Sequence, residues 1–599
     1  MCGIIGYLGN NAEQQLIGPL KQLQNRGYDS AGISLVLTNK YYIKKYATTL
    51  EHDSIEMLEN NIYPESINGI GHTRWATHGS KTKENSHPHI SHNHIISIVH
   101  NGIIENYMEL KEFLLDLKYT FSSETDSEVI SNLLEYFYLQ DQDMLVAIKK
   151  LNNTLKGTWG LCIQNVCEPT ILYATRNGSP ILIGHTSKYA MISSEDCGFC
   201  SKVNTYFELK SKDICKIEYT DNIQITTNEY YEKIKNNQEF QEFLPEPFKH
   251  WTLKEIHEQP NVVERVTNYG SRYNNEGKIK LGGLDKHKNL LYNINHLILL
   301  GCGTSYYSSC IGVKFMKKWG YFDTVQVFDA GDFSKHDIPK NGKVVFIFVS
   351  QSGETKDLYN CIELLENYIK IGVINKVDSL IAREVDFGCY LNAGREVGVA
   401  STKSFTSQVI MLSMIALWFN QLENGNQLYH KKIINQLKLL PEQINSVLKN
   451  DILKEYPRYI KNDCFILGKD YDEYVAKEGS LKMKELTYVH CEGYSSSSLK
   501  HGPYALIDKD FPVILISPDD HNWNKNENIY NELKSRQANI ITITTKEIKR
   551  NNTIIVPTNS VYQCLINTIV IQIISYYTSV QRNINPDKPK NLAKVVTVD

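Results

Sequence analysis

The fold class is decided by the stretch His296-Leu297-Ile298-Leu299-Leu300-Gly301-Cys302-Gly303-Thr304-Ser305. An apolar run that leads through a glycine- and hydroxyl-rich turn into a helical pattern is typical of a strand–loop–helix unit in a parallel α/β sheet. A similar strand occurs at 463–468, and second strands follow in both regions, at 343–350 and 511–517. We therefore predict an internal duplication of a doubly wound α/β unit, over residues 284–430 and 452–590.

The amino-terminal region has a different pattern. Short β-branched and aromatic runs, such as 95–99 and 171–173, alternate with Gly and Asn turns, and a helical pattern covers 126–138. This mixture predicts an α+β domain over 2–230 with mostly antiparallel sheet. The charged, proline-containing segment 231–251 is the predicted linker between the two regions.

Composition excludes several classes of protein. A formal net charge of −3 over 599 residues gives no global field for nucleic acid or for an anionic membrane. The 13 Cys include no C-x-x-C pair, and the amino terminus lacks a secretory pattern, so we expect reduced thiols and a cytoplasmic protein. The apolar segments 551–581 and 409–419 are interrupted or too short to span a membrane, so both are predicted to be buried helices.

A nucleophile is predicted at Cys2. Once Met1 is removed, the α-amine of Cys2 can act as the base for its own thiol, which then attacks a carbonyl carbon as the thiolate. On this residue alone an incidental cysteine is the more common explanation. Three further segments change that assessment, namely 26–32 (RGYDSAG), 71–79 (GHTRWATHG) and 100–106 (HNGIIEN).

Together with Cys2, these segments resemble the motifs of the class II glutamine amidotransferases, in the same order. The resemblance implies that Arg74 binds the α-carboxylate of glutamine through its planar guanidinium and that Asp126 accepts the α-ammonium. It also implies that the Asn101 side-chain amide and the Gly102 N–H form the oxyanion hole. Trp75, Thr77 and His78 join the glutamine-binding residues, with Trp75 beside an internal passage for ammonia.

Two hydroxyl-rich loops follow neighbouring predicted strands. Thr304 and Ser305 follow the first strand, and the second strand ends in Ser350-Gln351-Ser352-Gly353-Glu354-Thr355. The first loop is no dinucleotide motif, because Tyr306 stands where a third Gly is required. Since the carboxyl ends of neighbouring parallel strands meet at one edge of a sheet, the two loops predict a sugar-phosphate site there. Taken singly, each loop is explained equally by ordinary helix capping.

These loops and the duplication resemble the sugar isomerase (SIS) domains. The order of the domains, the tail 591–598 (NLAKVVTV) and the segment 500–503 (KHGP) resemble the glutamine:fructose-6-phosphate aminotransferase (isomerizing) family. The implied fold is an α+β N-terminal-nucleophile glutaminase domain followed by two α/β SIS domains with parallel sheets and a catalytic tail, 591–599. The implied sugar-phosphate residues are Thr304, Ser305, Ser350, Gln351, Ser352, Thr355, Val399 and Ser401.

The same resemblance supplies roles for four catalytic groups of the sugar site. Glu485 is the base that moves a proton between C1 and C2, with Lys482 as its electrostatic neighbour, and the two share a helical face with Glu478. His501 assists opening of the sugar ring, and Lys594 forms a Schiff base with the open-chain ketone. From the residues alone, a solvated salt-bridge stripe and a solvated terminal lysine are the simpler explanations.

The function implied is conversion of glutamine and fructose 6-phosphate into glucosamine 6-phosphate and glutamate, with no metal or other cofactor. The family is typically oligomeric, so a homodimer or homotetramer is expected. Two alternatives stay open: another class II amidotransferase with a different phosphosugar acceptor, and a non-enzymatic SIS-type sensor of sugar phosphates. Two departures from the family pattern, Ser498 before the KHGP segment and Lys590 in place of Arg, remove no predicted catalytic group.

Overall fold

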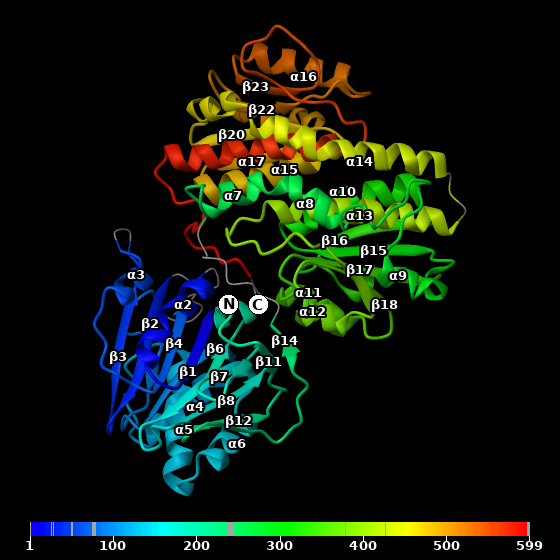
Figure 1. The fold of residues 1–599 in the computed structure, drawn as a ribbon. Coiled ribbons are helices and arrows are strands. Elements are labelled where there is room, and N and C mark those ends of the chain that lie inside the picture. The colour runs from blue at the N-terminus through cyan, green and yellow to red at the C-terminus, as the bar shows by residue number, and fades with distance from the viewer. Residues whose placement is uncertain are drawn as a thin grey trace. The chain divides into compact units, whose positions relative to one another are not determined.

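The computed structural model describes residues 2–24, 27, 29–49, 52–74, 80–236, 245–377, 379–423, 425 and 427–595. The chain divides into two compact units, Met1–Phe243 and Leu244–Thr597. We call them the amino-terminal and carboxy-terminal units, and Figure 1 labels their elements.

The amino-terminal unit contains two antiparallel sheets. The eight-stranded sheet has the order β14-β11-β9-β10-β1-β4-β2-β3, and the six-stranded sheet has the order β13-β12-β8-β7-β6-β5. Their strands are β1 (Gly3–Leu8), β2 (Ser30–Leu37), β3 (Lys40–Ala47), β4 (Asn68–Arg74), β5 (His89–Ile90), β6 (Ile96–Ile104), β7 (Gly157–Asn165), β8 (Ile171–Asn177), β9 (Leu182–His185), β10 (Ala190–Ser193), β11 (Thr205–Glu208), β12 (Ile214–Tyr219), β13 (Ile223–Thr226) and β14 (Ile234–Lys235).

Helices cover the outer faces of these two sheets. Between the sheets lies an apolar layer to which β1 contributes Ile4 and β6 contributes Val99. The helices of the unit are α1 (Ala12–Gln15), α2 (Ile17–Leu23), α3 (Ser54–Glu59), α4 (Tyr107–Asp116), α5 (Asp126–Asp141), α6 (Met144–Thr154) and the 3-10 helix η2 (Asp196–Phe199). α2 and α3 pack on the eight-stranded sheet, and α4 to α6 pack on the six-stranded sheet. The predicted α+β class with antiparallel sheets is confirmed.

The segment predicted as a linker, 231–251, is structured at both ends. Tyr231 packs on Phe207 with ring centroids 4.6 Å apart, and its hydroxyl donates to Asp213 Oδ2 at 2.5 Å. These contacts hold the segment against the unit, and β14 then pairs with β11. Residues 237–244 lie outside the described residues, and α7 (Trp251–His257) begins at the other end.

The carboxy-terminal unit contains two parallel five-stranded sheets. Their orders are β16-β15-β17-β18-β19 and β21-β20-β22-β23-β24. The strands are β15 (His296–Gly301), β16 (Thr324–Asp329), β17 (Val344–Ser350), β18 (Ile369–Ile374), β19 (Phe387–Tyr390), β20 (Asp463–Gly468), β21 (His490–Ser495), β22 (Pro512–Ile516), β23 (Asn539–Thr544) and β24 (Thr553–Ile555). Numbered within its own sheet, each set of strands has the order 2-1-3-4-5, which is the arrangement expected of a duplicated doubly wound unit.

Both faces of these sheets are buried. In β15, Leu297 and Leu299 face a central core that also includes residues of β20, whereas Ile298 and Leu300 face a separate outer core. The helices of the unit are α7, α8 (Gln259–Val266), α9 (Gly282–Asp285), α10 (Thr304–Trp319), α11 (Lys356–Leu364), α12 (Leu380–Glu384), α13 (Lys403–Leu422), α14 (Gln427–Leu448), α15 (Tyr471–Thr487), α16 (Trp523–Ser535) and α17 (Gln563–Gln581), with 3-10 helices η3 (Lys288–Leu291), η4 (Lys335–Asp337), η5 (Asp451–Tyr459), η6 (Ser496–His501) and η7 (Pro503–Leu506). The central core joins both sheets through α10, α13, α15 and α17, so two SIS-type sheets form one compact unit.

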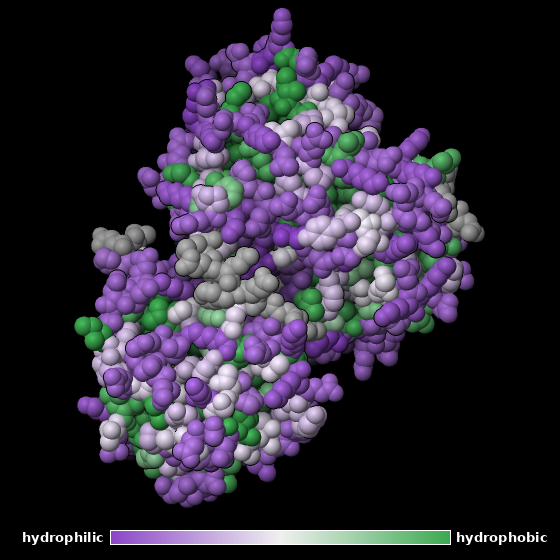
Figure 2. Space-filling model, viewed as in Figure 1, coloured by the Kyte–Doolittle hydropathy of each residue, from purple (hydrophilic) through white to green (hydrophobic). Residues whose placement is uncertain are grey.

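The most apolar helices are core helices. Among the described residues one helix, α13, is long and apolar enough to span a membrane, but 83% of its apolar window is buried inside the protein. α17 is buried over most of its length as well. The segment 409–419 is confirmed as part of a buried helix. The segment 551–581 is a buried helix only over 563–581, because residues 553–555 form the strand β24 instead. The face drawn in Figure 2 is mostly hydrophilic, with its hydrophobic residues in small, separate groups.

Candidate active sites

Cys2 lies immediately before β1, beside the end of β4. The N–H of Gly3 donates to Thr73 Oγ1 at 3.1 Å, and Gly3 pairs with Thr73 in the sheet. A β-carbon at Gly3 would meet Leu23 and Thr73 at 2.6–2.7 Å, so a glycine is required here. The close packing of Gly3 fixes the start of the strand and thereby the position of Cys2.

Asn101 and Gly102 lie on β6, and the Asn101 side chain contacts Cys2. The Asn101 Nδ2 donates to the Cys2 carbonyl oxygen at 2.8 Å. Gly102 has a φ of 138°, and a β-carbon there would overlap the carbonyl oxygen of Thr158 on β7. Only glycine therefore fits at this turn of the backbone, which lies directly after the proposed oxyanion amide.

Arg74 and Asp126 are buried charged groups of the same unit. The exposed fractions of the two side chains are 3% and 4%. Burial lowers the pKa of Arg74, and the nearby groups of Cys2, Asp29 and Asp126 oppose that shift. Asp126 is the first residue of α5, and its Oδ2 accepts the N–H of Ile104 at 2.9 Å, two residues beyond Gly102. Arg74 thus interacts electrostatically with both Cys2 and Asp126. Trp75, Thr77 and His78 lie outside the described residues.

The two hydroxyl loops of the first parallel sheet lie at its switch point. β15 and β17 are neighbours, and their carboxyl ends lead into Thr304 and into residues 350–355. In the second loop, Ser350 Oγ accepts the Gly353 N–H at 2.9 Å, and Thr355 is the N-cap of α11. Gly353 has a φ of 67°, and a β-carbon there would overlap Ser379 Oγ. The loop is a tight turn that leads into the first residues of α11, where free backbone N–H groups favour binding of an anion.

The two SIS-type regions meet through Thr304. Its hydroxyl accepts a hydrogen bond from Lys482 Nζ at 3.0 Å and donates to Glu478 Oε1 at 3.2 Å, both on α15. Lys482 Nζ also donates to Glu485 Oε2 at 2.5 Å. The predicted proton-transfer pair therefore lies beside the predicted sugar loop, in one network.

Burial and charge act in opposite directions within this network. Burial lowers the pKa of Lys482, but the Glu478 and Glu485 carboxylates more than offset it, so the pKa is raised. Burial raises the pKa of Glu478 to about 8, against the effect of Lys482. Glu485 is the more accessible carboxylate, since its side chain is 19% exposed and that of Glu478 is fully buried.

Lys594 is a buried ion-pair residue, although a lysine this close to a terminus suggested a solvated one. Its Nζ donates to Glu396 Oε2 at 2.7 Å and lies 3.3 Å from Ser401 Oγ. Burial raises the pKa of Glu396, but Lys594 and the Thr402 N–H outweigh it, so the pKa is lowered to about 2. Glu396 also acts electrostatically on Lys482, so the tail lysine belongs to the same charged region as α15.

The residues just before the tail are also held by specific contacts. Both carboxylate oxygens of Asp587 accept N–H groups at the start of α7, from Trp251 at 2.8 Å and Thr252 at 2.7 Å. Lys590 Nζ lies 4.4 Å from the centroid of the Tyr488 ring. These contacts position the tail so that Lys594 reaches Ser401.

Three further predicted site residues have contacts or exposure that the sequence did not indicate. Ser305 is 9% exposed, and its Oγ accepts a hydrogen bond from Gln408 Nε2 at 2.9 Å inside the helical layer. His501 ends η6 as an exposed residue. Val399 is buried, and its N–H donates to the Asp587 carbonyl oxygen at 3.3 Å.

Comparison with known proteins gives family matches in three regions of the chain. The SIS domain family matches residues 290–418 and 459–582, and the glutamine amidotransferase domain family matches residues 72–200. A protein of Acanthamoeba polyphaga mimivirus, named probable glutamine–fructose-6-phosphate aminotransferase (isomerizing), is 40% identical, with all of each chain covered. The chain belongs to the glutamine–fructose-6-phosphate aminotransferase (isomerizing) family.

Other aminotransferases of this family are also similar over their full length. The enzyme of Chlorobaculum tepidum is 35% identical, with all of each chain covered. Among solved structures, the C-terminal domain of the Francisella tularensis glucosamine-fructose-6-phosphate aminotransferase has a TM-score of 0.55 at 29% identity. It covers 58% of this chain and 99% of that domain. The family resemblance drawn from the motifs is thereby confirmed, together with the fold class.

Two buried carboxylates of this aminotransferase were not predicted from sequence. Glu396 binds Lys594, and Glu255 on α7 accepts the N–H of Val397 and, at 3.3 Å, that of Gly398. Burial raises the pKa of Glu255 to about 8. The sequence gives little indication that Glu396 belongs to the site, because it is a single charged residue, outside any recognised motif, three positions before Val399.

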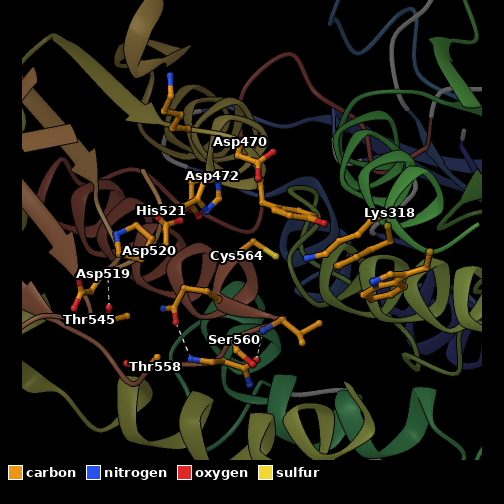
Figure 3. A pocket seen from close by; sticks show the side chains of 18 residues that line it. Lys318, Asp470, Asp472, Asp519, Asp520, His521, Thr545, Thr558, Ser560 and Cys564 are labelled. Carbon is orange, nitrogen blue, oxygen red and sulfur yellow. Dashed lines mark hydrogen bonds between the residues drawn. The ribbon is translucent and has the colours of Figure 1, made fainter. Parts of the chain in front are cut away.

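The second switch point of the aminotransferase chain differs from the first. A cavity of about 330 Å³ lies at the carboxyl ends of β20, β22 and β23 (Figure 3). Its lining includes four carboxylates and three basic side chains, Asp470, Asp472, Asp519, Asp520, Lys318, Lys469 and His521. Nothing here corresponds to the hydroxyl run of 350–355, so the duplicated units have diverged at this edge. The part of the chain that the structure describes has no group of three or more His, Cys, Asp or Glu arranged to hold a metal ion.

Asp472 gives this cavity a testable pH dependence. It is 5% exposed, its Oδ1 accepts a hydrogen bond from Asn567 Nδ2 at 2.9 Å, and burial raises its pKa from 3.8 to about 7. Between these values the folded state holds a proton that the unfolded state has lost, so the free energy of unfolding falls as pH rises through this window. In Asp472→Asn the side chain cannot ionise, so its contribution to the free energy of unfolding does not fall as pH rises. We expect the variant to exceed the wild type in stability by about 1–3 kcal/mol at pH 8, and by much less at pH 5.

Urea unfolding at the two pH values measures this difference. Asp519→Asn is the matched control, because the Asp519 side chain lines the same cavity but is half exposed and lies 3.2 Å from Lys546 Nζ. Its stability difference from wild type should change by less than about 0.5 kcal/mol between pH 5 and pH 8. A pH-independent difference for Asp472→Asn would contradict the prediction.

Proposed function

We propose that the protein transfers the amide nitrogen of L-glutamine to D-fructose 6-phosphate and releases D-glucosamine 6-phosphate and glutamate. One observation carries the proposal. The carboxy-terminal unit brings Thr304, the Lys482–Glu485 pair and the buried Lys594 into one charged region at a sheet switch point. Full-length identity of 33–40% to glutamine–fructose-6-phosphate aminotransferases supports the same reaction.

The proposed glutamine reaction uses Cys2 as nucleophile. After removal of Met1, the α-amine takes the thiol proton, and the thiolate attacks the side-chain amide carbon of glutamine. The α-ammonium then gives this proton to the leaving nitrogen as the C–N bond breaks, ammonia departs, and water hydrolyses the thioester to glutamate. Asn101 and Gly102 would stabilise the negative oxygen of each tetrahedral intermediate, while Arg74 and Asp126 would bind the α-carboxylate and α-ammonium. The Asn101–Cys2 hydrogen bond and the burial of both charged groups support these roles.

The proposed sugar reaction begins with phosphate binding at Ser350, Gln351, Ser352 and Thr355. Thr304 and Ser305 would contact the sugar end, Val399 and Ser401 would line the pocket, and His501 would assist ring opening. The Lys594 amine condenses with the C2 ketone to give an imine and water, and ammonia then displaces the lysine. Glu485 removes a proton from C1 and returns it at C2, beside the Lys482 cation. The contacts of Lys482 and Lys594 support this arrangement.

We further propose the domain division 2–230, 284–430, 452–590 and a tail 591–599, with 231–251 as the linker. A homodimer or homotetramer is proposed from the family resemblance alone, and sedimentation analysis would test it. A cytoplasmic location is supported by the cysteines, since all 13 are free thiols in the structure.

The proposed function is tested by incubating the purified protein with glutamine and fructose 6-phosphate. We expect one glutamate for each glucosamine 6-phosphate formed. Glutamate without amino sugar would indicate a different acceptor, to be sought among other phosphosugars. Binding of fructose 6-phosphate with neither product would instead indicate a sensor.

A further inference from the structure

His72 is a fully buried residue of β4 that contacts the proposed oxyanion amide. Its Nε2 lies 3.0 Å from the carbonyl oxygen of His100 and 3.0 Å from Asn101 Oδ1. Both partners are oxygens that only accept hydrogen bonds. The Nε2 atom must therefore carry the proton, and His72 donates to both.

The surroundings of His72 keep its ring neutral. Burial lowers its pKa to about 3, against the hydrogen bonds to Asn101 and His100, and the Arg74 charge acts in the same direction as burial. The His87 ring stacks on it with centroids 4.0 Å apart, and burial holds the pKa of His87 well below its usual range too. Among the described residues, the His72 Nδ1 has no hydrogen-bond partner. These observations leave one state, a neutral ring protonated at Nε2.

This state decides which way the Asn101 amide points. Because Oδ1 accepts from His72, the NH₂ group must face the other way, and there it donates to the Cys2 carbonyl oxygen at 2.8 Å. The reversed amide would set its NH₂ group against the His72 N–H, two donors facing each other. The His100 carbonyl prevents the ring from relieving that conflict, since it also needs the Nε2 proton.

We propose that His72 is a positioning residue of the glutaminase site, which keeps the Asn101 NH₂ directed at the oxygen that becomes negative during amide cleavage. The role rests on the proposed function of Cys2 and Asn101. Among the described residues, the hydrogen bonds of His72 go to the His100 carbonyl oxygen and to Asn101 Oδ1, so in this scheme it acts through Asn101. Loss of one oxyanion donor typically costs about 10²–10³ in kcat, and a misdirected donor gives part of that loss.

The test is a double-mutant cycle between His72 and Asn101 on glutamine hydrolysis. His72→Phe preserves an aromatic ring that can stack on His87 but removes the Nε2–H that donates to Asn101. We therefore expect kcat to fall about 10- to 100-fold, while KM for glutamine changes less than about 3-fold. His72→Gln places an amide N–H near the Nε2 position and should restore most of kcat. In the Asn101→Ala background, His72→Phe should cost almost nothing further.

His89→Phe is the matched control. His89 belongs to the same buried group of rings, with its centroid 4.6 Å from that of His87, but it bonds Thr125 Oγ1 at 3.1 Å rather than Asn101. Its effect should add to that of Asn101→Ala. Should His72→Phe fail to fold, His72→Asn serves in its place, because its shorter amide does not reach Asn101 and should give the same cycle.

The outcomes separate the inference from the proposed function. Equal costs of His72→Phe in the wild-type and Asn101→Ala backgrounds, or failure of His72→Gln to restore kcat, would overturn the positioning role alone. Wild-type glutamine hydrolysis by Asn101→Ala would overturn the oxyanion assignment and the positioning role together.

Discussion

Cys2→Ala is expected to abolish glutamine hydrolysis while leaving ammonia-dependent synthesis of glucosamine 6-phosphate. Without the thiol no thioester can form, so glutamate release should fall at least about a thousand-fold. The residues proposed for the sugar reaction, Lys482, Glu485 and Lys594, belong to the other unit and are unchanged. Glutamate release and amino-sugar formation are measured separately, first with glutamine and then with an ammonium salt as the nitrogen source.

The matched control for this variant is Cys167→Ala, which removes an exposed free thiol of the same unit. It should retain both activities. Glutamine hydrolysis by Cys2→Ala at the wild-type rate would exclude Cys2 as nucleophile. Loss of the ammonia-dependent reaction as well would show that the two sites do not work independently.

Lys594→Arg is expected to show the opposite pattern, with glutamine hydrolysis retained and sugar conversion lost about a thousand-fold or more. Arginine keeps a positive charge for the buried Glu396 carboxylate, but its guanidinium cannot condense with a ketone. Lys594→Ala is a less clean test, because an unpaired buried carboxylate can cost about 3–5 kcal/mol of stability. Borohydride trapping with fructose 6-phosphate, read by mass spectrometry of the tail peptide, should label wild type and not Lys594→Arg.

The control for Lys594→Arg is Lys590→Ala, which changes a lysine four residues earlier, just before the tail. Lys590 lies over the Tyr488 ring and contacts no proposed catalytic group among the described residues. It should keep sugar conversion within a few-fold of wild type. Full synthase activity in Lys594→Arg, or trapping on another lysine, would contradict the Schiff-base role.

Much of the fold follows from the sequence because its determinants are local. Short apolar strands followed by glycine- and hydroxyl-rich turns predicted the duplicated parallel units, and both sheets have the same strand order. Short β-branched and aromatic runs separated by Gly and Asn turns predicted the antiparallel sheets of the amino-terminal region. The pairing of β14 with β11 inside the proposed linker was not predicted, because it accompanies the packing of Tyr231 on the ring of Phe207, which is distant in sequence.

Motifs in the sequence indicate which residues the proposed site contains, whereas contacts between distant segments depend on packing that the sequence does not show. Motif order pointed to Cys2 and Asn101, and the structure joins them by one hydrogen bond. Glu396 could not be predicted as the partner of Lys594, since 198 positions separate them and only the docking of the tail brings them together. The inward position of Ser305 likewise depends on Gln408, which reaches it from another helix.

The capping of α7 by Asp587 ties the beginning of the carboxy-terminal unit to its end. The last described strand of the amino-terminal unit, β14, ends at residue 235, whereas α7 lacks the carboxylate of Asp587 until residue 587 has left the ribosome. At about 5–20 residues per second, these events are roughly 20–70 seconds apart. During synthesis, therefore, the unit that releases ammonia can be folded well before the unit that consumes it has closed.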